Sequence, residues 1–363
     1  MRSLTVAPQV AARLSAFMRS DLFTVQHGYS KSDYWQHFAD QLSVSIGDGA
    51  IDVAGVSGFY VPPSSSALRR AIRRLGQGVR NPAKALARLT ASVRGRFSTP
   101  RLLSYARAFD AVMSHADVSG PELSKFRIDH LALATRDKVF TDANGLSSHY
   151  RSWSGYALSD SIIHQYYHQN ILRGYVAEND IHTVMEIGAG NGNLPSILFH
   201  DWAPIRVILV DLPETLAIAI PFLSSLFPQA KLLLPHELSN GALAGGFDFA
   251  FLTVDQLDLI ADDSVDLSIN CDSFQEMTYE QIGIYFKLIQ RVTRDGGFFL
   301  TSNRVEKILT GSATEAGERP DRPNRFAEYP WSSQNEILAY EISRLVRLVQ
   351  LDGTFVRLER IRK

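Results

Sequence analysis

Cysteine is nearly absent from this sequence: Cys271 is the only one among 363 residues. No internal disulfide can form, which fits a protein of a reducing compartment. Cys271 lies in an apolar run, where a cysteine usually serves as a small core residue. Apolar runs are short as well, since none reaches the roughly 18 residues of a membrane span, and the amino terminus lacks the apolar core of a signal peptide. We therefore predict a cytoplasmic protein without a membrane span.

Net charge is also small. The formal charge is −1, with 45% hydrophobic and 21% charged residues, as in an ordinary globular protein. This balance gives no overall attraction to nucleic acid or to a membrane surface, and we expect no nucleic-acid partner. The length exceeds that of most single domains and predicts two.

One segment departs from the charge balance. Between Asp52 and Asp110 there is no acidic residue, while eleven residues are basic. Apolar residues are interspersed, so parts of this segment have the pattern of an amphipathic helix. Two interpretations stay open: a solvated helical face, or a patch for a phosphate-bearing substrate, an acidic partner or anionic lipid. The basic residues of this segment, 69–107, are Arg69, Arg70, Arg73, Arg74, Arg80, Lys84, Arg88, Arg94, Arg96, Arg101 and Arg107.

The first 150 residues show no alternation of strands and helices. Stretches such as 10–23 and 102–113 have helical periodicity instead. We predict a mostly helical N-terminal region over residues 1–150, followed by a second domain over residues 151–363.

The alternation typical of a parallel α/β sheet begins near residue 159. Strands are predicted at 183–187, 206–210, 265–271 and 298–302, and both 231–234 and 247–254 have strand character. Helices are predicted at 161–179, 194–199, 215–227 and 279–293. Near the end, an Asp-Gly turn at 352–353 between two alternating runs, 344–351 and 354–361, predicts an antiparallel hairpin.

The most informative segment is residues 184–195, Val-Met-Glu-Ile-Gly-Ala-Gly-Asn-Gly-Asn-Leu-Pro. Glycines at a strand-to-helix turn let a ligand approach the backbone closely. A second apolar run ends in Asp211, where a carboxylate can hold two ribose hydroxyls. The pair predicts a cofactor that contains adenosine.

The spacing of this segment indicates which cofactor. A dinucleotide site has the pattern G-x-G-x-x-G, but here Glu186 precedes Gly188, Gly190 and Gly192 at alternate positions. A carboxylate there repels a pyrophosphate and attracts a sulfonium or ammonium group. The segment resembles motif I of the class I S-adenosylmethionine-dependent methyltransferases. A tight turn without a ligand and a nicotinamide dehydrogenase are the alternatives.

The resemblance implies a Rossmann-like sheet closed by a C-terminal antiparallel hairpin, and S-adenosylmethionine as cofactor. Glu186 would attract the methionine amino group, and Asp211 would accept from the ribose diol, unless it only caps the next helix. Asp255 would accept from the adenine amino group, with Asp258 as the alternative. The implied cofactor-binding residues are Glu186, Gly188, Ala189, Gly190, Asp211, Leu212, Val254, Asp255, Gln256 and Asn270.

The loop after the strand at 265–271 is expected to carry the catalytic residues. Plant-type O-methyltransferases place a His and then an Asp in this loop, and these positions are Gln275 and Glu276 here. Glutamine cannot take a proton, so the base must be Glu276, Asp272 or a histidine from elsewhere. We favour Glu276, whose alternative role is to cap or orient the next helix. The candidate catalytic residues are Glu276, Asp272 and Gln275.

Residues 161–302 resemble more narrowly the sugar O-methyltransferase group of this superfamily, through 210–214, 256–266, Asn270 and 273–277. The resemblance implies methyl transfer to a hydroxyl oxygen of a sugar or glycosylated small molecule. The same fold acting on a phenol, a carboxylate or nitrogen is the alternative, as is a cofactor-binding partner protein without catalysis. A homo-oligomer is compatible with either.

Residues for the acceptor are chosen by chemistry, because flat aromatic rings stack on sugar faces. They are His149, Tyr167, His168 and Trp331. Trp331 and Tyr329 fall in the long run 304–335, which we predict to be a lid that also offers Arg319, Arg322 and Arg325; a surface loop is the alternative. His164 and His168 share a helix face, but nothing nearby completes a metal site, so no metal is predicted.

Overall fold

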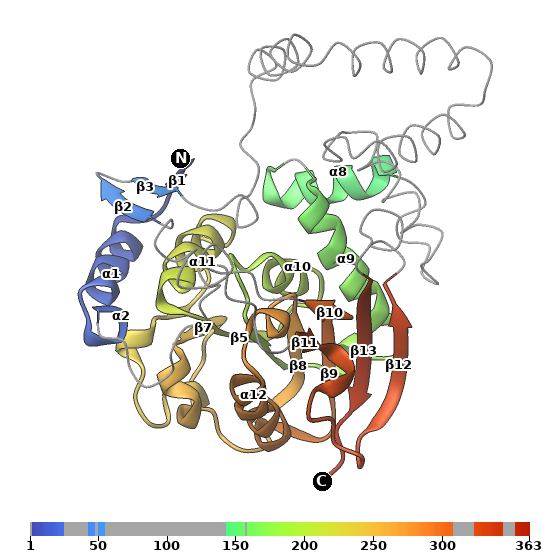
Figure 1. Ribbon diagram of the computed structural model, residues 1–363. Coiled ribbons are helices and arrows are strands. Elements are labelled where there is room, and N and C mark those ends of the chain that lie inside the picture. Colours follow the sequence, from blue (N-terminus) through green and yellow to red (C-terminus); the bar gives the residue numbers. More distant parts are fainter. Residues whose placement is uncertain are drawn as a thin grey trace, which may run out of the picture. The chain divides into compact units, whose positions relative to one another are not determined.

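The computed structural model describes residues 2–24, 43–47, 50–54, 143–156, 158–307, 323–343 and 353–363 (Figure 1). The chain divides into two compact units. The larger unit comprises Met1–Phe59, His168–Ser343 and Asp352–Lys363, and the smaller one Tyr60–Tyr167 and Arg344–Leu351. The basic segment 69–107, the helical stretch 102–113, and the lid residues Arg319 and Arg322 lie outside the described residues.

An eight-stranded sheet forms the centre of the larger unit, in the order β12-β13-β9-β8-β4-β5-β7-β6. Six of these strands, from β9 to β6, pair in parallel, while β13 and β12 run antiparallel to their neighbours. The predicted Rossmann-like methyltransferase sheet with an antiparallel end is thereby confirmed. The strands are β4 (Thr183–Ile187), β5 (Arg206–Val210), β6 (Leu232–Leu233), β7 (Phe249–Leu252), β8 (Val265–Cys271), β9 (Thr293–Arg304), β12 (Glu336–Ile342) and β13 (Thr354–Arg360).

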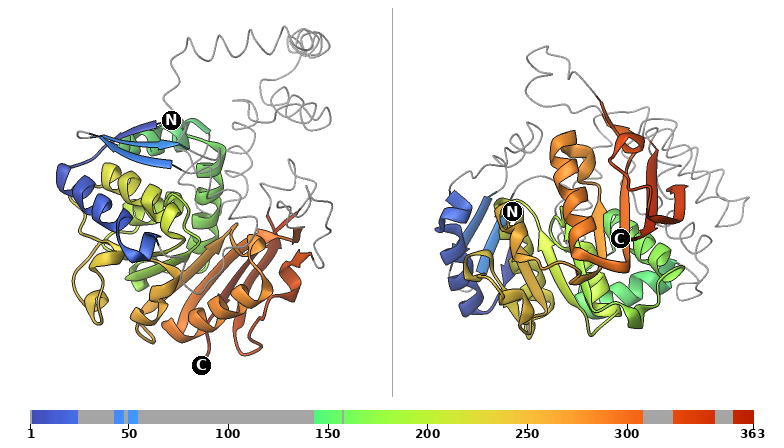
Figure 2. Two further views of the ribbon diagram at one scale, coloured as in Figure 1. Left: turned by 60° about the vertical axis from the view of Figure 1, so that its left-hand side comes forward. Right: turned by 90° about the horizontal axis from the view of Figure 1, so that it is seen from below.

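Continuous apolar sequence in the central strands reflects burial on both sides of the sheet. Every residue of β4 and β7 is buried, and so are four of the five in β5. Helices lie on both faces of the sheet, which removes the polar alternation that a half-exposed strand shows (Figure 2). Of the two predicted runs after β5, the later one, β7, pairs with β5, and β6 forms the edge.

The helices begin where their sequences provide a cap. In α12 (Tyr279–Val292), Thr278 accepts from the backbone of Gln281, whose side chain accepts in turn from the Thr278 N–H. In α11 (Pro213–Leu226), a proline occupies the first turn, where its missing N–H costs nothing. α10 (Asn193–Asp201) starts directly after the glycine turn.

At the antiparallel end of the sheet, β13 pairs with a different strand from the one that the sequence predicted. β13 was expected to pair with 344–351, but it pairs with β12, in which Ile342 faces Phe355 and Glu336 faces Arg360. Residues 344–352 lie outside the described residues. Alternation alone did not separate 336–342 from 344–351, because both runs mix apolar and polar residues.

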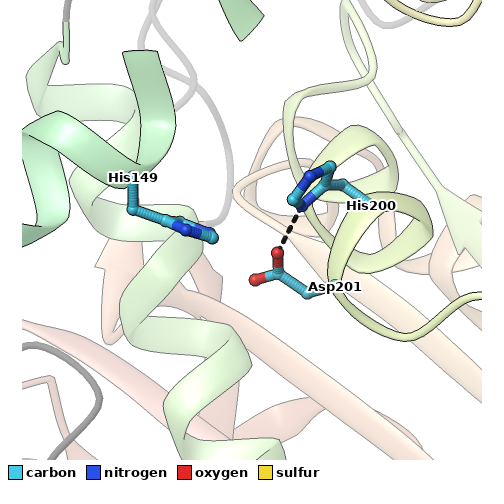
Figure 3. A group of neighbouring side chains, drawn as sticks. All are labelled: His149, His200 and Asp201. Atoms are coloured by element: carbon cyan, nitrogen blue, oxygen red, sulfur yellow. Dashed lines mark hydrogen bonds and ion pairs between the residues drawn. The ribbon is translucent and has the colours of Figure 1, made fainter. Parts of the chain in front are cut away.

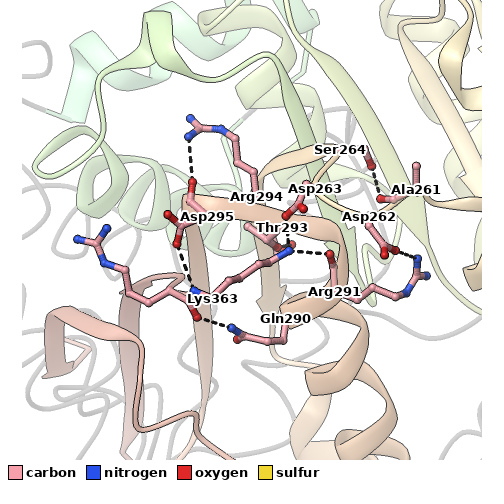
Figure 4. Close-up of polar contacts among 12 residues, drawn as sticks. Ala261, Asp262, Asp263, Ser264, Gln290, Arg291, Thr293, Arg294, Asp295 and Lys363 are labelled. Carbon is pink, nitrogen blue, oxygen red and sulfur yellow. Dashed lines mark hydrogen bonds and ion pairs between the residues drawn. The ribbon is translucent and has the colours of Figure 1, made fainter.

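The carboxyl terminus is fixed against the turns at the amino ends of β8 and β9 (Figure 4). Lys363 Nζ donates to the Arg291 carbonyl at 2.9 Å and pairs with Asp263. Gln290 Nε2 donates to the Arg362 carbonyl at 2.8 Å, which joins the end of α12 to the residues after β13. These contacts hold the edge of the sheet opposite to the one at which the parallel strands end.

The described residues of the N-terminal region contain strands that the sequence analysis did not predict. Its described residues include α1 (Pro8–Met18) and α2 (Asp21–Thr24), but also a three-stranded antiparallel sheet. The strands of this sheet are β1 (Arg2–Thr5), β2 (Ser43–Gly47) and β3 (Ala50–Ala54), in the order β1-β3-β2. Each strand is only four or five residues long, too short for its alternation to stand out in the sequence.

α1 is part of the larger unit, as Figures 1 and 2 show by its place beside α11. Arg13 pairs with Glu237 at 2.6 Å and donates to the Leu232 carbonyl at 2.7 Å. The Phe17 ring stacks on His236 with 6.3 Å between ring centres and is fully buried. The division at residue 150 stays a prediction, although these described residues before it pack on the sheet domain.

Within the smaller unit, α8 (Ala143–Ser154) and the first part of α9 (Asp160–Arg173) carry a cluster of aromatic rings. Tyr150 contacts Trp153 at 5.3 Å and Tyr166 at 6.3 Å between ring centres, in both cases edge to face. None of the described helices in either unit is long and apolar enough to cross a membrane.

Phe17 is expected to contribute strongly to the stability of the larger unit. Phe17→Ala should lower the free energy of unfolding by about 3–5 kcal/mol, because it leaves a cavity at a fully buried ring. Chemical denaturation measures the loss. Gln9→Ala, an exposed position in the same helix, is the control and should change stability little. Equal stability of both variants would show that α1 does not pack on the sheet domain.

Candidate functional site

Three carboxylate residues follow or end adjacent strands of the sheet. Glu186 lies on β4, Asp211 follows β5 directly, and Asp272 follows β8 directly. The order β8-β4-β5 makes these strands neighbours, and parallel strands end at the same edge. The three carboxylates therefore gather at the carboxyl edge, where α/β folds bind their ligands.

The turn after β4 requires glycine for two reasons. Gly188, Gly190 and Gly192 have φ of +71°, +59° and +84°, a region that other residues rarely adopt. A Cβ on Gly188 would lie 2.0 Å from Ser273 Oγ, so a side chain there would collide with the loop after β8. The predicted glycine turn thus brings two loops into direct contact.

Glu186 is buried with an unsatisfied oxygen. The residue is 4% exposed, and its Oε2 has no hydrogen-bond partner among the described residues. Burial raises the pKa of Glu186 well above its usual range, and the carboxylates of Asp211 and Asp272 raise it further. A buried carboxylate without a partner lowers the stability of the free protein. A ligand with an ammonium group would pair with it and offset this loss.

Asp211 supports the glycine turn. Its Oδ2 accepts from the Gly190 N–H at 2.8 Å and its Oδ1 from the Leu212 N–H at 2.7 Å. Burial raises the pKa of Asp211 to about 7, although these backbone hydrogen bonds act in the opposite direction. Each carboxylate oxygen keeps a lone pair beyond these bonds. Asp211 therefore does not cap α11, whose N-cap is Leu212 without a side-chain cap hydrogen bond, and it keeps acceptor capacity for a diol.

Asn270 is a structural brace between three strand ends. Its Nδ2 donates to the Ile187 carbonyl at 2.9 Å and to Ser273 Oγ at 2.6 Å. Its Oδ1 accepts from Asn303 Nδ2 on β9 at 2.9 Å. These bonds use both protons of the amide, so Asn270 shapes the cofactor edge rather than offering a donor to a ligand. Asn303 was not among the predicted site residues.

Gln275 and Glu276 lie in the 3-10 turn Phe274–Glu276. The side chain of each accepts a hydrogen bond from another part of the protein. Gln275 Oε1 accepts from the Arg304 N–H at 2.8 Å. Glu276 Oε1 accepts from Lys307 Nζ at 2.6 Å, and both residues are buried. Burial lowers the pKa of Lys307, while the Glu276 carboxylate opposes this effect. A carboxylate paired with an ammonium group has less affinity for a proton, which makes Glu276 a weaker candidate base than the sequence indicated.

Asp272 differs from both because the residue is exposed. The residue has φ of +60°, a left-handed conformation that Asp adopts more readily than most residues, and its N–H donates to the Ser302 carbonyl at 2.7 Å. Although solvent reaches it, surrounding protein atoms raise the pKa of Asp272 to about 6, and Glu276 adds to this while Arg304 and Lys307 oppose it.

The turn after β7 holds the residues predicted to contact adenine. Gln256 is committed to the protein, since its Oε1 accepts from the Thr253 N–H at 3.1 Å and its Nε2 donates to the Pro235 carbonyl at 2.8 Å. Val254 is buried, and Asp255 is exposed. Of the three, Asp255 is the one whose side chain can accept from a ligand.

The predicted lid is wrong for Tyr329 and Trp331. Tyr329 is 3% exposed, and its hydroxyl donates to Asn324 Oδ1 at 2.9 Å. The Trp331 ring packs against Phe286 and Phe326 with 5.1 Å and 5.0 Å between ring centres. The guanidinium of Arg357 covers the indole at 4.1 Å. The sequence showed aromatic residues in an aperiodic run, and tertiary packing placed them in the core.

Arg325, the remaining described residue of the predicted lid, pairs with Glu306 at 2.6 Å and Glu328 at 3.3 Å. The acceptor roles of His149 and Tyr167 stay predictions, because both belong to the smaller unit. His168 is buried, and burial lowers its pKa to about 4, so the imidazole is neutral at physiological pH.

A histidine that the sequence analysis did not single out, His200, lies in the last turn of α10. His200 Nδ1 lies 2.6 Å from Asp201 Oδ1, as Figure 3 shows. Asp201 also accepts from Gln169 Nε2 at 2.8 Å. The bond from Gln169 joins α9 to the end of α10, a contact that the sequence gave no sign of.

Comparisons with known proteins bear on the fold. A putative sarcosine dimethylglycine methyltransferase from Galdieria sulphuraria matches with 10% identity and a TM-score of 0.40, over 56% of this chain and 86% of that one. The N-methyltransferase NodS from Bradyrhizobium japonicum, solved with S-adenosylhomocysteine, matches with 12% identity and a TM-score of 0.37, over 56% and 88%.

A SAM-dependent methyltransferase from Aquifex aeolicus matches with 13% identity and a TM-score of 0.35, over 53% of this chain and 89% of that one. No family model matches the chain. No curated protein matches it either. Similarities at this level assign neither an acceptor nor site residues, and the strand order remains the observation that establishes the fold.

Glu186→Gln is expected to stabilise the protein at neutral pH. The unfolded carboxyl ionises near 4.5, whereas the folded pKa is well above this. A raised pKa means that its stabilising effect is present at low pH and is lost as the pH rises toward the folded pKa, by about 1.4 kcal/mol per pH unit. Melting temperatures of the variant and wild type should therefore diverge as the pH rises above about 5.

Glu280→Gln, which removes an exposed carboxylate from the first turn of α12, is the matched control. It should show no such divergence. A Glu186→Gln variant that melts below wild type across this range would contradict an unsatisfied buried carboxylate.

Proposed function

We propose that this protein binds S-adenosylmethionine and transfers its methyl group to a hydroxyl oxygen of a sugar or glycosylated small molecule. The observation that carries the proposal is the buried Glu186 carboxylate without a partner on Oε2, beside a glycine turn and Asp211. A ligand for this edge must bring positive charge to Glu186 and hydroxyl donors to Asp211.

S-adenosylmethionine has groups that match these requirements in kind. Its α-amino group is cationic, which suits Glu186, and its ribose diol offers two donors to Asp211. Asp255, the exposed acceptor after β7, is available for the adenine amino group. The positive φ of Gly188 and Gly190 leaves the turn without side chains where the cofactor would cross it.

The cofactor supplies an electrophilic methyl group on a sulfonium. The acceptor oxygen forms a bond to the methyl carbon as the carbon–sulfur bond breaks, and the electron pair of that bond leaves with sulfur. The hydroxyl proton passes to a base of the protein and then to solvent. In-line attack requires the two reactants to be held in register, so positioning supplies much of the acceleration.

The choice of a hydroxyl acceptor rests on the resemblance of Asn270 and 273–277 to the sugar O-methyltransferase group, together with Asp272. An exposed carboxylate after β8 can receive the proton of a hydroxyl, and it repels an anionic carboxylate acceptor. Glu276 keeps a supporting role, because its ion pair with Lys307 fixes the loop that carries Asp272.

Calorimetric titration with S-adenosylhomocysteine tests the cofactor site. Wild type should bind with micromolar affinity, and Asp211→Ala and Glu186→Gln should each bind about tenfold or more weakly, since each loses a charge-assisted hydrogen bond. Glu280→Gln should bind as wild type does. Absence of binding by folded wild-type protein would refute the proposal.

Binding should also release protons near neutral pH. An ammonium group stabilises the ionised form of Glu186, whose pKa is raised in the free protein, so the proton must leave on binding. Titrations in two buffers of different ionisation enthalpy measure this release. Wild type should release protons, and Glu186→Gln should release fewer. Equal release by both would argue against contact between the amino group and Glu186.

A further inference from the structure

Only two of the three carboxylates at the carboxyl edge have been matched to a group of the cofactor. Glu186 is assigned to the amino group and Asp211 to the ribose, whereas Asp272 has only been considered as a base. S-adenosylmethionine carries a second positive charge, on the sulfonium, which cannot donate a hydrogen bond. A nearby carboxylate attracts this charge and has no such attraction for the neutral sulfur of the product.

The backbone holds Asp272 next to the glycine turn. Ser273, the following residue, packs on Gly188 so closely that a Cβ there would lie 2.0 Å from Ser273 Oγ. Ser273 Oγ also accepts from Asn270 at 2.6 Å, and Asp272 itself is tied to the Ser302 carbonyl at 2.7 Å. The hydrogen bonds of Asp272 and of Ser273 therefore hold Asp272 in its left-handed conformation, with φ of +60°.

The carboxylate of Asp272 is not used by the described protein. No hydrogen bond or ion pair among the described residues involves its side-chain oxygens, and the residue is exposed. Glu276, the other acid of this loop, is buried and paired with Lys307 at 2.6 Å. Arg304 and Lys307 act on Asp272 through their charge, and the residue stays exposed beside the glycine turn.

We propose that Asp272 is the charge partner of the sulfonium and makes this site bind the charged donor more tightly than the neutral product. The inference rests on the proposed function, because it assumes that the glycine turn holds S-adenosylmethionine. It assigns Asp272 a specificity role that does not depend on which acceptor is used. Preference for the donor also favours release of the product after each turnover.

Burial and three charged groups set the ionisation of Asp272. Burial raises its pKa most and Glu276 adds to this, while Arg304 on β9 and Lys307 on β10 (Glu306–Lys307) lower it, with a net value of about 6. Asp272 in turn raises the pKa of Glu186 on β4. Preference for the donor should therefore be strong at about pH 7.5 and decline toward about pH 5, as Asp272 takes up a proton.

The test compares S-adenosylmethionine with S-adenosylhomocysteine by calorimetry on the full chain. Wild type should bind the donor roughly tenfold more tightly than the product at neutral pH. In Asp272→Asn the two affinities should become nearly equal, through weaker donor binding with product binding unchanged. Asn has the same shape and tolerates a left-handed φ, so this variant preserves the loop.

Glu280→Gln removes the same formal charge from an exposed site a few residues further on and should keep the wild-type ratio. Equal affinity of wild type for both ligands, or an unchanged ratio in Asp272→Asn, would overturn the inference while leaving the cofactor site intact. Failure of wild type to bind either ligand would instead refute the proposed function, and the two failures are therefore distinguishable.

Discussion

The hydrogen bonds of Asn270 hold together the edge of the sheet on which the candidate site depends. This side chain joins the end of β4, the loop after β8 and Asn303 on β9. Ser273, which it positions, packs on Gly188 and excludes any side chain there. Glu186 precedes this turn on β4, and its Oε2 is buried without a hydrogen-bond partner among the described residues. A buried polar network lowers stability unless each of its groups has a hydrogen-bond partner. At this edge Glu186 Oε2 has none among the described residues, and it is the acceptor left for a ligand.

Those parts of the fold with strong periodicity were predictable from the sequence. The bounds of β4, β5 and β8 agree with the predicted strands, because each is a short run rich in apolar residues that ends at a turn with glycine or a carboxylate. The glycine turn was predictable because few residues other than glycine adopt a positive φ. Asp211 was predictable because a carboxylate directly after a buried strand has few roles other than binding a ligand or the next helix. β1–β3 and the pairing of β13 with β12 depend on contacts between distant segments, which short alternations do not specify.

The position of a site residue was predictable only where its role does not depend on neighbours that are distant in the sequence. Glu186 and Asp211 fall at the expected edge, but the roles of Gln275, Glu276 and Trp331 were decided by their neighbours. Lys307 neutralises Glu276 from a strand 31 positions later in the chain, and Arg357 covers Trp331 from β13. Neither partner has a sequence signature, because an ion pair or a cation–π contact becomes visible only when the strands are placed side by side. The exposed Asp272 consequently gains the importance that sequence reasoning gave to Glu276.

The central claim is that this carboxyl edge binds S-adenosylmethionine through Glu186 and Asp211. The most direct measurement is a crystal structure of the full chain with S-adenosylhomocysteine. We expect the ligand amino group within hydrogen-bond distance of Glu186 Oε2, and both ribose hydroxyls donating to the Asp211 carboxylate. A ligand bound elsewhere, with Glu186 still unpartnered, would contradict the account.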